Sequence, residues 1–232
     1  MIDVPAHCAD SRTTTTPSYI ALEGCIGVGK TTLAAMLGKR FAARTVMEIV
    51  EENPFLSQFY EDQSLHAFKT QMFFLLSRYR QQQEMLQVDL FQQSLVSDYL
   101  FAKDRIFAQL TLQGHELVLY DQVYAALKPQ LRQPDLVIFL RAPVDVILRR
   151  IRRRGRSFER DIDVGYLEQL IGAYNRFFAT YDLSPMVIVD TDDLDFPGSA
   201  ADFQILVTAI DTFDVATGKR HLSKAHNQPA LL

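Results

Sequence analysis

The sequence predicts an α/β fold in which a parallel sheet carries helices on both faces. Three observations predict it: short apolar segments alternate with longer amphipathic ones, a glycine-rich loop joins the first apolar segment to the first amphipathic one, and charged residues follow several apolar segments. Strands of a parallel sheet are buried on both faces and read as nearly continuous apolar runs. Ligands of such sheets bind beyond the carboxyl ends of the strands, so we expect the functional site at that edge.

Five short apolar segments are expected to form the strands, and Leu-Val-Ile-Phe-Leu at 136–140 is the clearest of them. The expected strands are residues 19–23, 44–50, 94–98, 136–140 and 186–190. Helices are expected between them, because apolar residues recur there with the spacing of one helix face. The expected helices are residues 32–41, 55–61, 64–91, 104–112, 116–127, 144–153, 163–181 and 201–213.

Residues 24–32, Gly-Cys-Ile-Gly-Val-Gly-Lys-Thr-Thr, fit the pattern G-x-x-x-x-G-K-[ST] of a phosphate-binding loop. Backbone N–H groups must wrap the phosphates, so the loop needs glycines, which accept unusual dihedral angles and carry no side chain. Lys30 is expected to reach the β- and γ-phosphates of ATP, and the Thr31 hydroxyl to bind Mg²⁺. A glycine turn that matches by chance is the alternative, but the strand before the loop and the helix after it favour phosphate binding. The expected ATP-binding residues here are Gly24, Cys25, Ile26, Gly27, Val28, Gly29, Lys30, Thr31 and Thr32.

Two acidic residues near predicted strand ends are candidates for the chemistry. Asp98 closes an apolar strand, where a second acid would help to hold Mg²⁺. Glu48 closes another strand and is the candidate base that takes a proton from an attacking hydroxyl. A simple turn cap remains the alternative for Asp98, and Glu51 and Glu52 compete with Glu48.

Six of the eight residues from 149 to 156 are arginines. Such a run is often only a solvated helix face. Beside a phosphate loop it also suits a lid, because guanidinium groups stabilise the negative charge of a phosphoryl group in transfer. We therefore expect an arginine-rich lid in which Arg150, Arg154 and Arg156 act on the phosphates.

Length and composition indicate a single domain at residues 19–215, with a flexible N-terminal tail at 1–18 and a C-terminal tail at 216–232. The net charge of −4 argues against binding to nucleic acid or a membrane surface, and no apolar run is long enough to span a bilayer. The two cysteines, Cys8 and Cys25, form no disulfide framework and fit a cytoplasmic protein. Cys25 reads as a small filler of the loop rather than a nucleophile.

Five motifs follow one another in the chain: the phosphate loop, Asn53-Pro54-Phe55-Leu56 with Phe59-Tyr60, Phe68-x-x-Gln71 with Arg78, Asp98 with Lys103 to Ala108, and Arg150 with Arg154-Gly155-Arg156 and Glu159. In this order they resemble the deoxynucleoside kinases of the deoxycytidine, deoxyguanosine and deoxyadenosine kinase group, especially the bacterial members. The resemblance spans about residues 19–195. The resemblance implies a P-loop kinase fold that transfers a phosphoryl group from ATP to the 5′-hydroxyl of a deoxynucleoside.

The resemblance also implies roles for individual residues. Glu48 would be the base for the 5′-hydroxyl, and Asp98 would lie near Mg²⁺. The remaining matches are Tyr60 and Glu159 for the 3′-hydroxyl, Gln71, Arg78 and Asp104 for the base, Arg150, Arg154 and Arg156 for the lid, and Asp190 and Asp192 for a loop over the adenine of ATP. From the residues alone, Gln71 and Arg78 lie two helical turns apart and can face one pocket, although solvated helix positions are the alternative.

Two departures from the family pattern concern the acceptor side. The arginine that follows the acid in the family is Tyr99 here, and the proline after the base is Ile49. The work of the missing arginine would pass to a lid arginine or to Arg141, or activity would be low.

The sequence thus predicts an ATP- and Mg²⁺-dependent deoxynucleoside kinase of nucleotide salvage, with a purine deoxynucleoside or deoxycytidine favoured over thymidine. A thymidylate kinase-like enzyme is the nearest alternative, but acidic residues at 48, 51 and 52 would repel a phosphate acceptor. A non-catalytic nucleotide-binding protein is the alternative from another class. The apolar stripe at 64–91 is expected either to form a homodimer face or to belong to the core.

Overall fold

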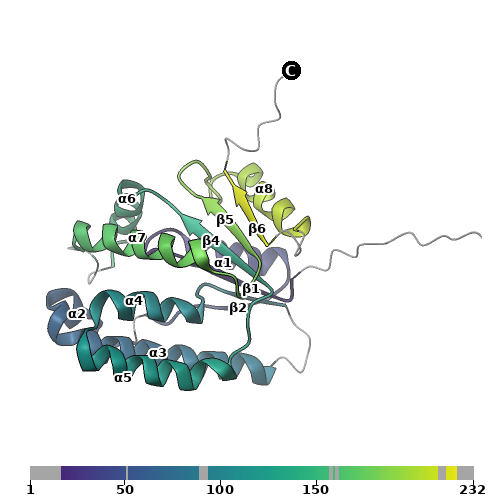
Figure 1. Cartoon of the computed structure of the whole chain (residues 1–232). Coiled ribbons are helices and arrows are strands. Elements are labelled where there is room, and N and C mark those ends of the chain that lie inside the picture. The colour runs from purple at the N-terminus through teal and green to yellow at the C-terminus, as the bar shows by residue number, and fades with distance from the viewer. Residues whose placement is uncertain are drawn as a thin grey trace, which may run out of the picture.

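A six-stranded parallel sheet forms the centre of the fold in the computed structural model (Figure 1). The structure describes residues 17–50, 52–88, 94–156, 159, 162–213 and 218–223. The strands are β1 (Tyr19–Gly24), β2 (Arg44–Val46), β3 (Leu95–Ser97), β4 (Leu136–Arg141), β5 (Met186–Asp190) and β6 (Lys219–Leu222), in the order β2-β3-β1-β4-β5-β6. All five pairings are parallel, which confirms the predicted fold class.

The sheet differs from the prediction at its two edges. The sixth strand, β6, lies within the range expected to be a C-terminal tail, so the prediction of five strands was wrong by one. Its sequence, Lys-Arg-His-Leu, has only one buried side chain, because an edge strand exposes most of its residues and lacks the apolar signature. At the other edge, β2 ends at Val46, four residues before the predicted end at 50. Most of the expected N-terminal tail lies outside the described residues.

Helices cover both faces of the sheet, with α7 in front of it and α1 behind it in Figure 1. The helices are α1 (Lys30–Arg40), α2 (Leu56–Glu61), α3 (Gln63–Val88), α4 (Asp104–Thr111), α5 (Gly114–Leu127), α6 (Val144–Arg154), α7 (Val164–Thr180) and α8 (Ala200–Asp211), with 3₁₀ turns η2 (Phe101–Lys103) and η3 (Lys128–Gln130). Every predicted helix is present, with ends shifted by a few residues. No helix in the described ranges has the length and apolar character needed to cross a membrane.

Stacked aromatic rings join α7 to β4 in the core. Phe139 of β4 stacks on Phe178 of α7 with ring centroids 4.2 Å apart, and Tyr174 stacks beside them. Each of the six residues of β1 is also buried. This packing holds the carboxyl ends of β1 and β4 in fixed positions, and the glycine-rich loop follows directly from β1.

A second group of helices lies beside the sheet and supplies the other half of the site. Helix α3 packs against α2, α4 and α5, and α4 packs in turn against α7 (Figure 1). The chain enters this group of helices between β2 and β3. After β3 it enters the group a second time, through η2. Residues 48, 78 and 103 are therefore brought together although they are distant in sequence.

Candidate active site

The glycine-rich loop is shaped by glycines that no other residue could replace. Gly24 and Gly27 have φ angles of 151° and 81°. A Cβ on Gly24 would lie 2.4 Å from the carbonyl oxygen of Leu140, and one on Gly27 would lie 2.6 Å from Cγ1 of Ile151. Strand β4 and helix α6 therefore press on the loop from two sides, and only glycine fits.

Lys30 begins helix α1 and folds back over the loop. Its Nζ donates to the carbonyl oxygens of Gly24 and Cys25 at 2.7 and 3.3 Å. Cys25 is buried, and burial raises the pKa of its thiol from 9.0 to about 12. A thiol with so high a pKa is not a nucleophile at neutral pH, which agrees with the prediction of a filler residue.

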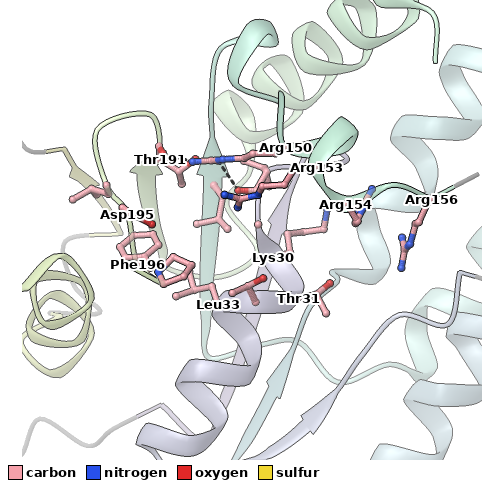
Figure 2. A pocket seen from close by; sticks show the side chains of 17 residues that line it. Lys30, Thr31, Leu33, Arg150, Arg153, Arg154, Arg156, Thr191, Asp195 and Phe196 are labelled. Atoms are coloured by element: carbon pink, nitrogen blue, oxygen red, sulfur yellow. Dashed lines mark hydrogen bonds between the residues drawn. The ribbon is translucent and has the colours of Figure 1, made fainter. Parts of the chain in front are cut away.

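A cavity of about 410 Å³ opens above the loop (Figure 2). One wall consists of the loop and the start of α1, and another consists of arginines from α6 and the segment after it. Its lining residues are Gly27 to Leu33, Leu140, Arg150, Arg153, Arg154, Arg156, Thr191 and Leu194 to Pro197. The cavity thus joins a phosphate-binding floor to an apolar end at Leu194, Phe196 and Pro197.

Asp190 and Asp192, the residues expected near the adenine of ATP, are not part of this lining. Asp190 Oδ1 accepts from Arg141 Nε at 2.9 Å, and its Oδ2 lies 2.6 Å from His221 Nε2. Asp192 is exposed. The apolar residues that follow them in sequence form the cavity end instead. The sequence contained a signal for this end of the cavity. Leu194, Phe196 and Pro197 are apolar, and a flat base packs well on apolar side chains.

The lid arginines surround the cavity, but they also have protein partners. Arg150 Nη1 donates to the carbonyl oxygen of Val28 at 2.9 Å, and both Nη atoms donate to Thr191, to Oγ1 at 2.8 Å and to the carbonyl oxygen at 2.6 Å. Burial lowers the pKa of Arg150, with the neighbouring arginines adding to the effect. Arg154 pairs with Glu159, and Arg156 lies 3.7 Å from the same carboxylate. Arg150 therefore joins the loop to the end of β5.

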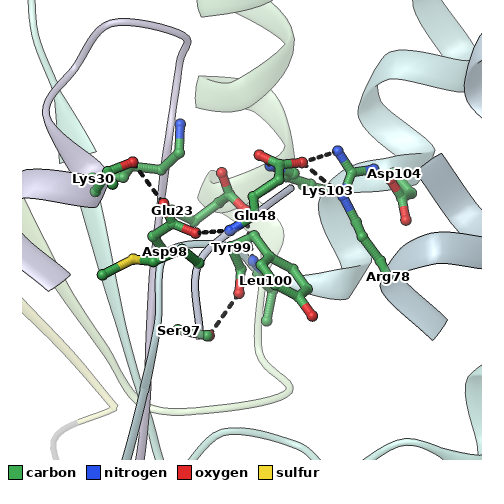
Figure 3. Close-up of polar contacts among 12 residues, drawn as sticks. Glu23, Lys30, Glu48, Arg78, Ser97, Asp98, Tyr99, Leu100, Lys103 and Asp104 are labelled. Carbon is green, nitrogen blue, oxygen red and sulfur yellow. Dashed lines mark hydrogen bonds and ion pairs between the residues drawn. The ribbon is translucent and has the colours of Figure 1, made fainter. Parts of the chain in front are cut away.

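Asp98 connects the phosphate loop to Glu48 (Figure 3). Its Oδ2 accepts from Thr31 Oγ1 at 2.6 Å, and its Oδ1 accepts from the backbone N–H of Glu48 at 2.6 Å. Asp98 is therefore more than a turn cap. Among the described residues no group of three or more His, Cys, Asp or Glu side chains forms a metal site. The hydroxyl of Thr31 and the carboxylate of Asp98 are adjacent, and both supply hard oxygen ligands. Mg²⁺ binds few such protein groups and completes its coordination with water and phosphate oxygens.

Glu23 is a buried acid for which no specific role was predicted. It is the residue before the last of β1 and has no exposed surface. Its Oε1 accepts from the N–H of Gly24 at 2.9 Å and from the hydroxyl of Tyr174 at 3.2 Å, and its Oε2 accepts from the N–H of Leu100 at 2.8 Å. Glu23 thus braces the loop against the segment after β3. An acid in an otherwise apolar strand was the only sequence signal.

Glu48 lies at the centre of a buried ion-pair network. Its Oε1 accepts from Arg78 Nε at 2.8 Å, and its Oε2 accepts from Lys103 Nζ at 2.6 Å (Figure 3). Burial alone would raise the pKa of the carboxyl, but Arg78 and Lys103 outweigh it and lower the pKa below the ordinary value of 4.5. Of its two competitors, Glu52 is exposed and Glu51 lies outside the described residues.

The expected base-reading residues are buried together rather than solvated. Gln71 and Arg78 on α3 are 3% and 4% exposed. Arg78 also forms an ion pair with Asp104, and its guanidinium lies over the ring of Phe74 at 4.6 Å. The alternative of solvated helix positions is therefore wrong for Gln71 and Arg78.

The residues expected to hold the 3′-hydroxyl also approach one another. Glu159 is buried, and Tyr60 packs edge-on against Phe59. Burial raises the pKa of the Tyr60 hydroxyl, and the nearby Tyr166 and Glu159 raise it further. A neutral hydroxyl and a carboxylate that influence each other electrostatically suit a ligand hydroxyl, which both donates and accepts.

Tyr99, at the position of the missing arginine, is fully buried, and its hydroxyl has no hydrogen-bond partner among the described residues. Arg141 pairs with Asp190 and His221 and makes no hydrogen bond or ion pair with Glu48. Lys103 is the cation beside Glu48, and this place in the site was not predicted from the sequence. The sequence signal for it was the position of Lys103, one short turn after Asp98.

Comparison with known protein families gives a match over most of the chain. The deoxynucleoside kinase family matches residues 20–214. Deoxyguanosine kinase of Bacillus subtilis (strain 168) is 39% identical over 194 residues, which cover 82% of this chain and 94% of that protein. Deoxyadenosine kinase of Dictyostelium discoideum is 34% identical over 165 residues, which cover 69% of this chain and 66% of that protein.

Solved structures of a deoxyadenosine kinase also match this chain over most of its length. Deoxyadenosine kinase from M. mycoides, with the products dCMP and a flexible dCDP bound, superposes with a TM-score of 0.74 at 28% identity, covering 84% of this chain and 99% of that one. The same enzyme with bound dATP gives a TM-score of 0.73 and covers 83% and 98%.

Proposed function

The chain belongs to the deoxynucleoside kinase family, and we propose that deoxyguanosine is its preferred acceptor. It is an ATP-dependent phosphotransferase that acts on the hydroxyl of a deoxynucleoside in nucleotide salvage. One observation supports the assignment of the residues most strongly. The carboxylate of Asp98 accepts from the hydroxyl of Thr31 and from the backbone N–H of Glu48, so the phosphate loop and the backbone that carries the proposed proton acceptor are joined through one side chain.

In the proposed reaction, Glu48 takes the proton of the 5′-hydroxyl as the 5′-oxygen forms its bond to the γ-phosphorus. The bond from the γ-phosphorus to the β,γ-bridging oxygen breaks, ADP leaves, and the deoxynucleoside 5′-monophosphate forms. Lys30 and the lid residues Arg154 and Arg156 stabilise the charge on the transferring group, and closure of the lid excludes water. Arg150 donates to both the loop and the residue after β5, and it would keep the two in fixed relative positions during this step.

The oxygens of Thr31 and Asp98 fit Mg²⁺, and we propose that they hold it, directly or through water. When bound, the ion neutralises negative charge on the β- and γ-phosphates. The donor is ATP, whose triphosphate would lie on the loop with its adenine toward the apolar end of the cavity.

A preference for guanine follows from the pair of Arg78 and Asp104. Guanine offers acceptors at O6 and N7 and donors at N1 and N2, which match a guanidinium and a carboxylate. Gln71 offers a further donor and acceptor. The name of the Bacillus subtilis relative supports deoxyguanosine, whereas other relatives are named for deoxyadenosine and deoxycytidine. We therefore expect deoxyadenosine and deoxycytidine as weaker acceptors and thymidine as the weakest.

We further propose a homodimer in the cytoplasm. Four large apolar side chains are exposed on the adjacent helices α3 and α5, namely Leu65, Leu76, Val118 and Leu119. Apolar side chains exposed on neighbouring helices suit contact with a second copy. The buried free thiol of Cys25 is compatible with a reducing compartment.

The test is ATP consumption by the purified protein with Mg²⁺ and, separately, deoxyguanosine, deoxyadenosine, deoxycytidine, thymidine or dTMP. We expect the highest kcat/KM with deoxyguanosine and a loss of roughly 10²–10⁴-fold in kcat for Glu48→Gln, because a general base contributes that much. Glu52→Gln, at an exposed position on the same segment, is the matched control and should keep wild-type activity. Turnover of dTMP alone would instead indicate a monophosphate kinase, and bound ATP without turnover of any acceptor would indicate a non-catalytic binder.

A further inference from the structure

Lys103 is a buried cation with a single hydrogen-bond acceptor. It is 2% exposed, and among the described residues its Nζ donates only to Glu48 Oε2, at 2.6 Å. The same Nζ lies 5.9 Å from the centre of the Tyr99 ring. Burial of an ammonium group is costly unless the charge is paired, so the geometry ties Lys103 to Glu48.

Lys103 differs from Arg78, the other cation at Glu48. Arg78 also pairs with Asp104 and lies over Phe74, so it belongs to the group that faces the base. Lys103 has no second anion in hydrogen-bond contact within the described ranges. Its side chain is therefore available to one task, which is to hold the carboxylate of Glu48.

The backbone supports the same assignment. Lys103 ends the η2 turn, and Asp104 begins α4 directly after it. Two consecutive residues thus fix both sides of the acceptor site: one pairs with Glu48 and the next with Arg78. The N–H of Glu48 is held separately by Asp98, so backbone and carboxylate are fixed by different groups.

We propose that Lys103 is a positioning residue of phosphoryl transfer: it orients the carboxylate of Glu48 toward the acceptor hydroxyl and supplies the positive charge that Tyr99 cannot. This inference rests on the proposed role of Glu48 as the base. Burial lowers the pKa of Lys103, whereas Glu48 and Glu23 act in the opposite direction. The charged groups around the pair are Glu23 of β1, Lys30 of α1, Arg78 of α3, Asp98 after β3 and Asp104 of α4.

The test compares Lys103→Met and Lys103→Arg with wild type by kcat, by KM for ATP and deoxyguanosine, and by the pH profile of kcat. Arg105→Met is the matched control, because Arg105 is two residues away, half exposed and paired with Asp121 outside the site. For Lys103→Met we expect a loss of about 10²-fold in kcat with little change in either KM, because misplacing a reacting group costs about that much.

The pH profile separates positioning from mere folding. Removing the cation raises the pKa of Glu48, so the acid limb of kcat in Lys103→Met should move upward by about one unit or more. Lys103→Arg keeps the charge and should recover kcat to within about tenfold with the acid limb of the wild type. If Lys103→Met does not fold, Lys103→Arg decides alone: kcat within about tenfold of the wild type supports the inference, and a larger loss of kcat in a folded variant contradicts it.

Three results would overturn the inference: unchanged kcat and acid limb in Lys103→Met, a loss confined to KM, or a loss of kcat with an unshifted profile that Lys103→Arg does not recover. Absence of deoxynucleoside turnover in the wild type would overturn the proposed function and this inference together. Turnover in the wild type that is indifferent to Lys103 would overturn only the inference.

Discussion

The proposed donor and acceptor halves of the active site are built in opposite ways. The donor half is a cavity of about 410 Å³ whose floor is the contiguous backbone of one loop. The acceptor half is a closed network of side chains, in which Glu48, Arg78, Lys103 and Asp104 satisfy one another's charges. Asp98 is the connection between the two halves.

This difference reflects what each half must recognise. A triphosphate is the same for every reaction and can be held by N–H groups and a lysine, which need no side-chain specificity. A nucleoside must be selected by its base, which requires several side chains in fixed relative positions. The side chains proposed for that task, Arg78 and Asp104, pair with each other, which fixes their relative positions.

The largest expected effect tests the independence of the donor half. Lys30→Ala should lower kcat by roughly 10²–10³-fold, because it removes a preorganised cation from the phosphates. The loss should be equal for deoxyguanosine and deoxyadenosine. The melting temperature should change little, since the hydrogen bonds of Lys30 Nζ to described residues go only to the carbonyl oxygens of Gly24 and Cys25. Lys39→Ala, an exposed lysine at the other end of α1, is the control. A loss that depends on the base would show that the halves are coupled more tightly than Asp98 alone implies.

The next effect concerns the stability of the acceptor network. Glu48→Gln should lower the free energy of unfolding at neutral pH by about 2–3 kcal/mol, because glutamine keeps a hydrogen bond but leaves buried cations without their anion. The folded-state pKa of Glu48 is lowered, so its contribution is present above the unfolded-state value of 4.5 and is lost as the pH falls below it. The difference between wild type and variant, measured by urea unfolding, should therefore shrink in acid. A difference independent of pH would contradict the ionised network.

The smallest effect concerns base selection within the acceptor half. Asp104→Asn should lower the ratio of kcat/KM for deoxyguanosine over deoxyadenosine by about tenfold, because a carboxylate accepts from both guanine donors and an amide does not. The KM for ATP should stay unchanged. Asp121→Asn, at a half-exposed position that pairs with Arg105, is the control. An equal loss with both nucleosides would assign Asp104 to holding Arg78 rather than to reading the base.

The order and type of nearly all elements could be predicted from the sequence, because buried strands and amphipathic helices leave a local pattern. The strand β6 could not, since at the sheet edge its side chains need not be apolar. The end of β2 was overestimated for a related reason. Residues 47–50 contain apolar side chains, but they leave the sheet and carry Glu48 toward Asp98 instead.

The same division holds within the site. The phosphate loop could be predicted from residue types alone, because such a loop depends on consecutive backbone groups and on residue types at fixed spacing. The packing of the elements determines that Arg150 joins the loop to β5, that Asp190 pairs with Arg141, and that Lys103 joins Arg78 beside Glu48. Arg78 and Lys103 lie 30 and 55 positions from Glu48 in the chain. Ion pairs over such distances depend on how α3 and η2 pack beside β3, and no local pattern of residues encodes that packing.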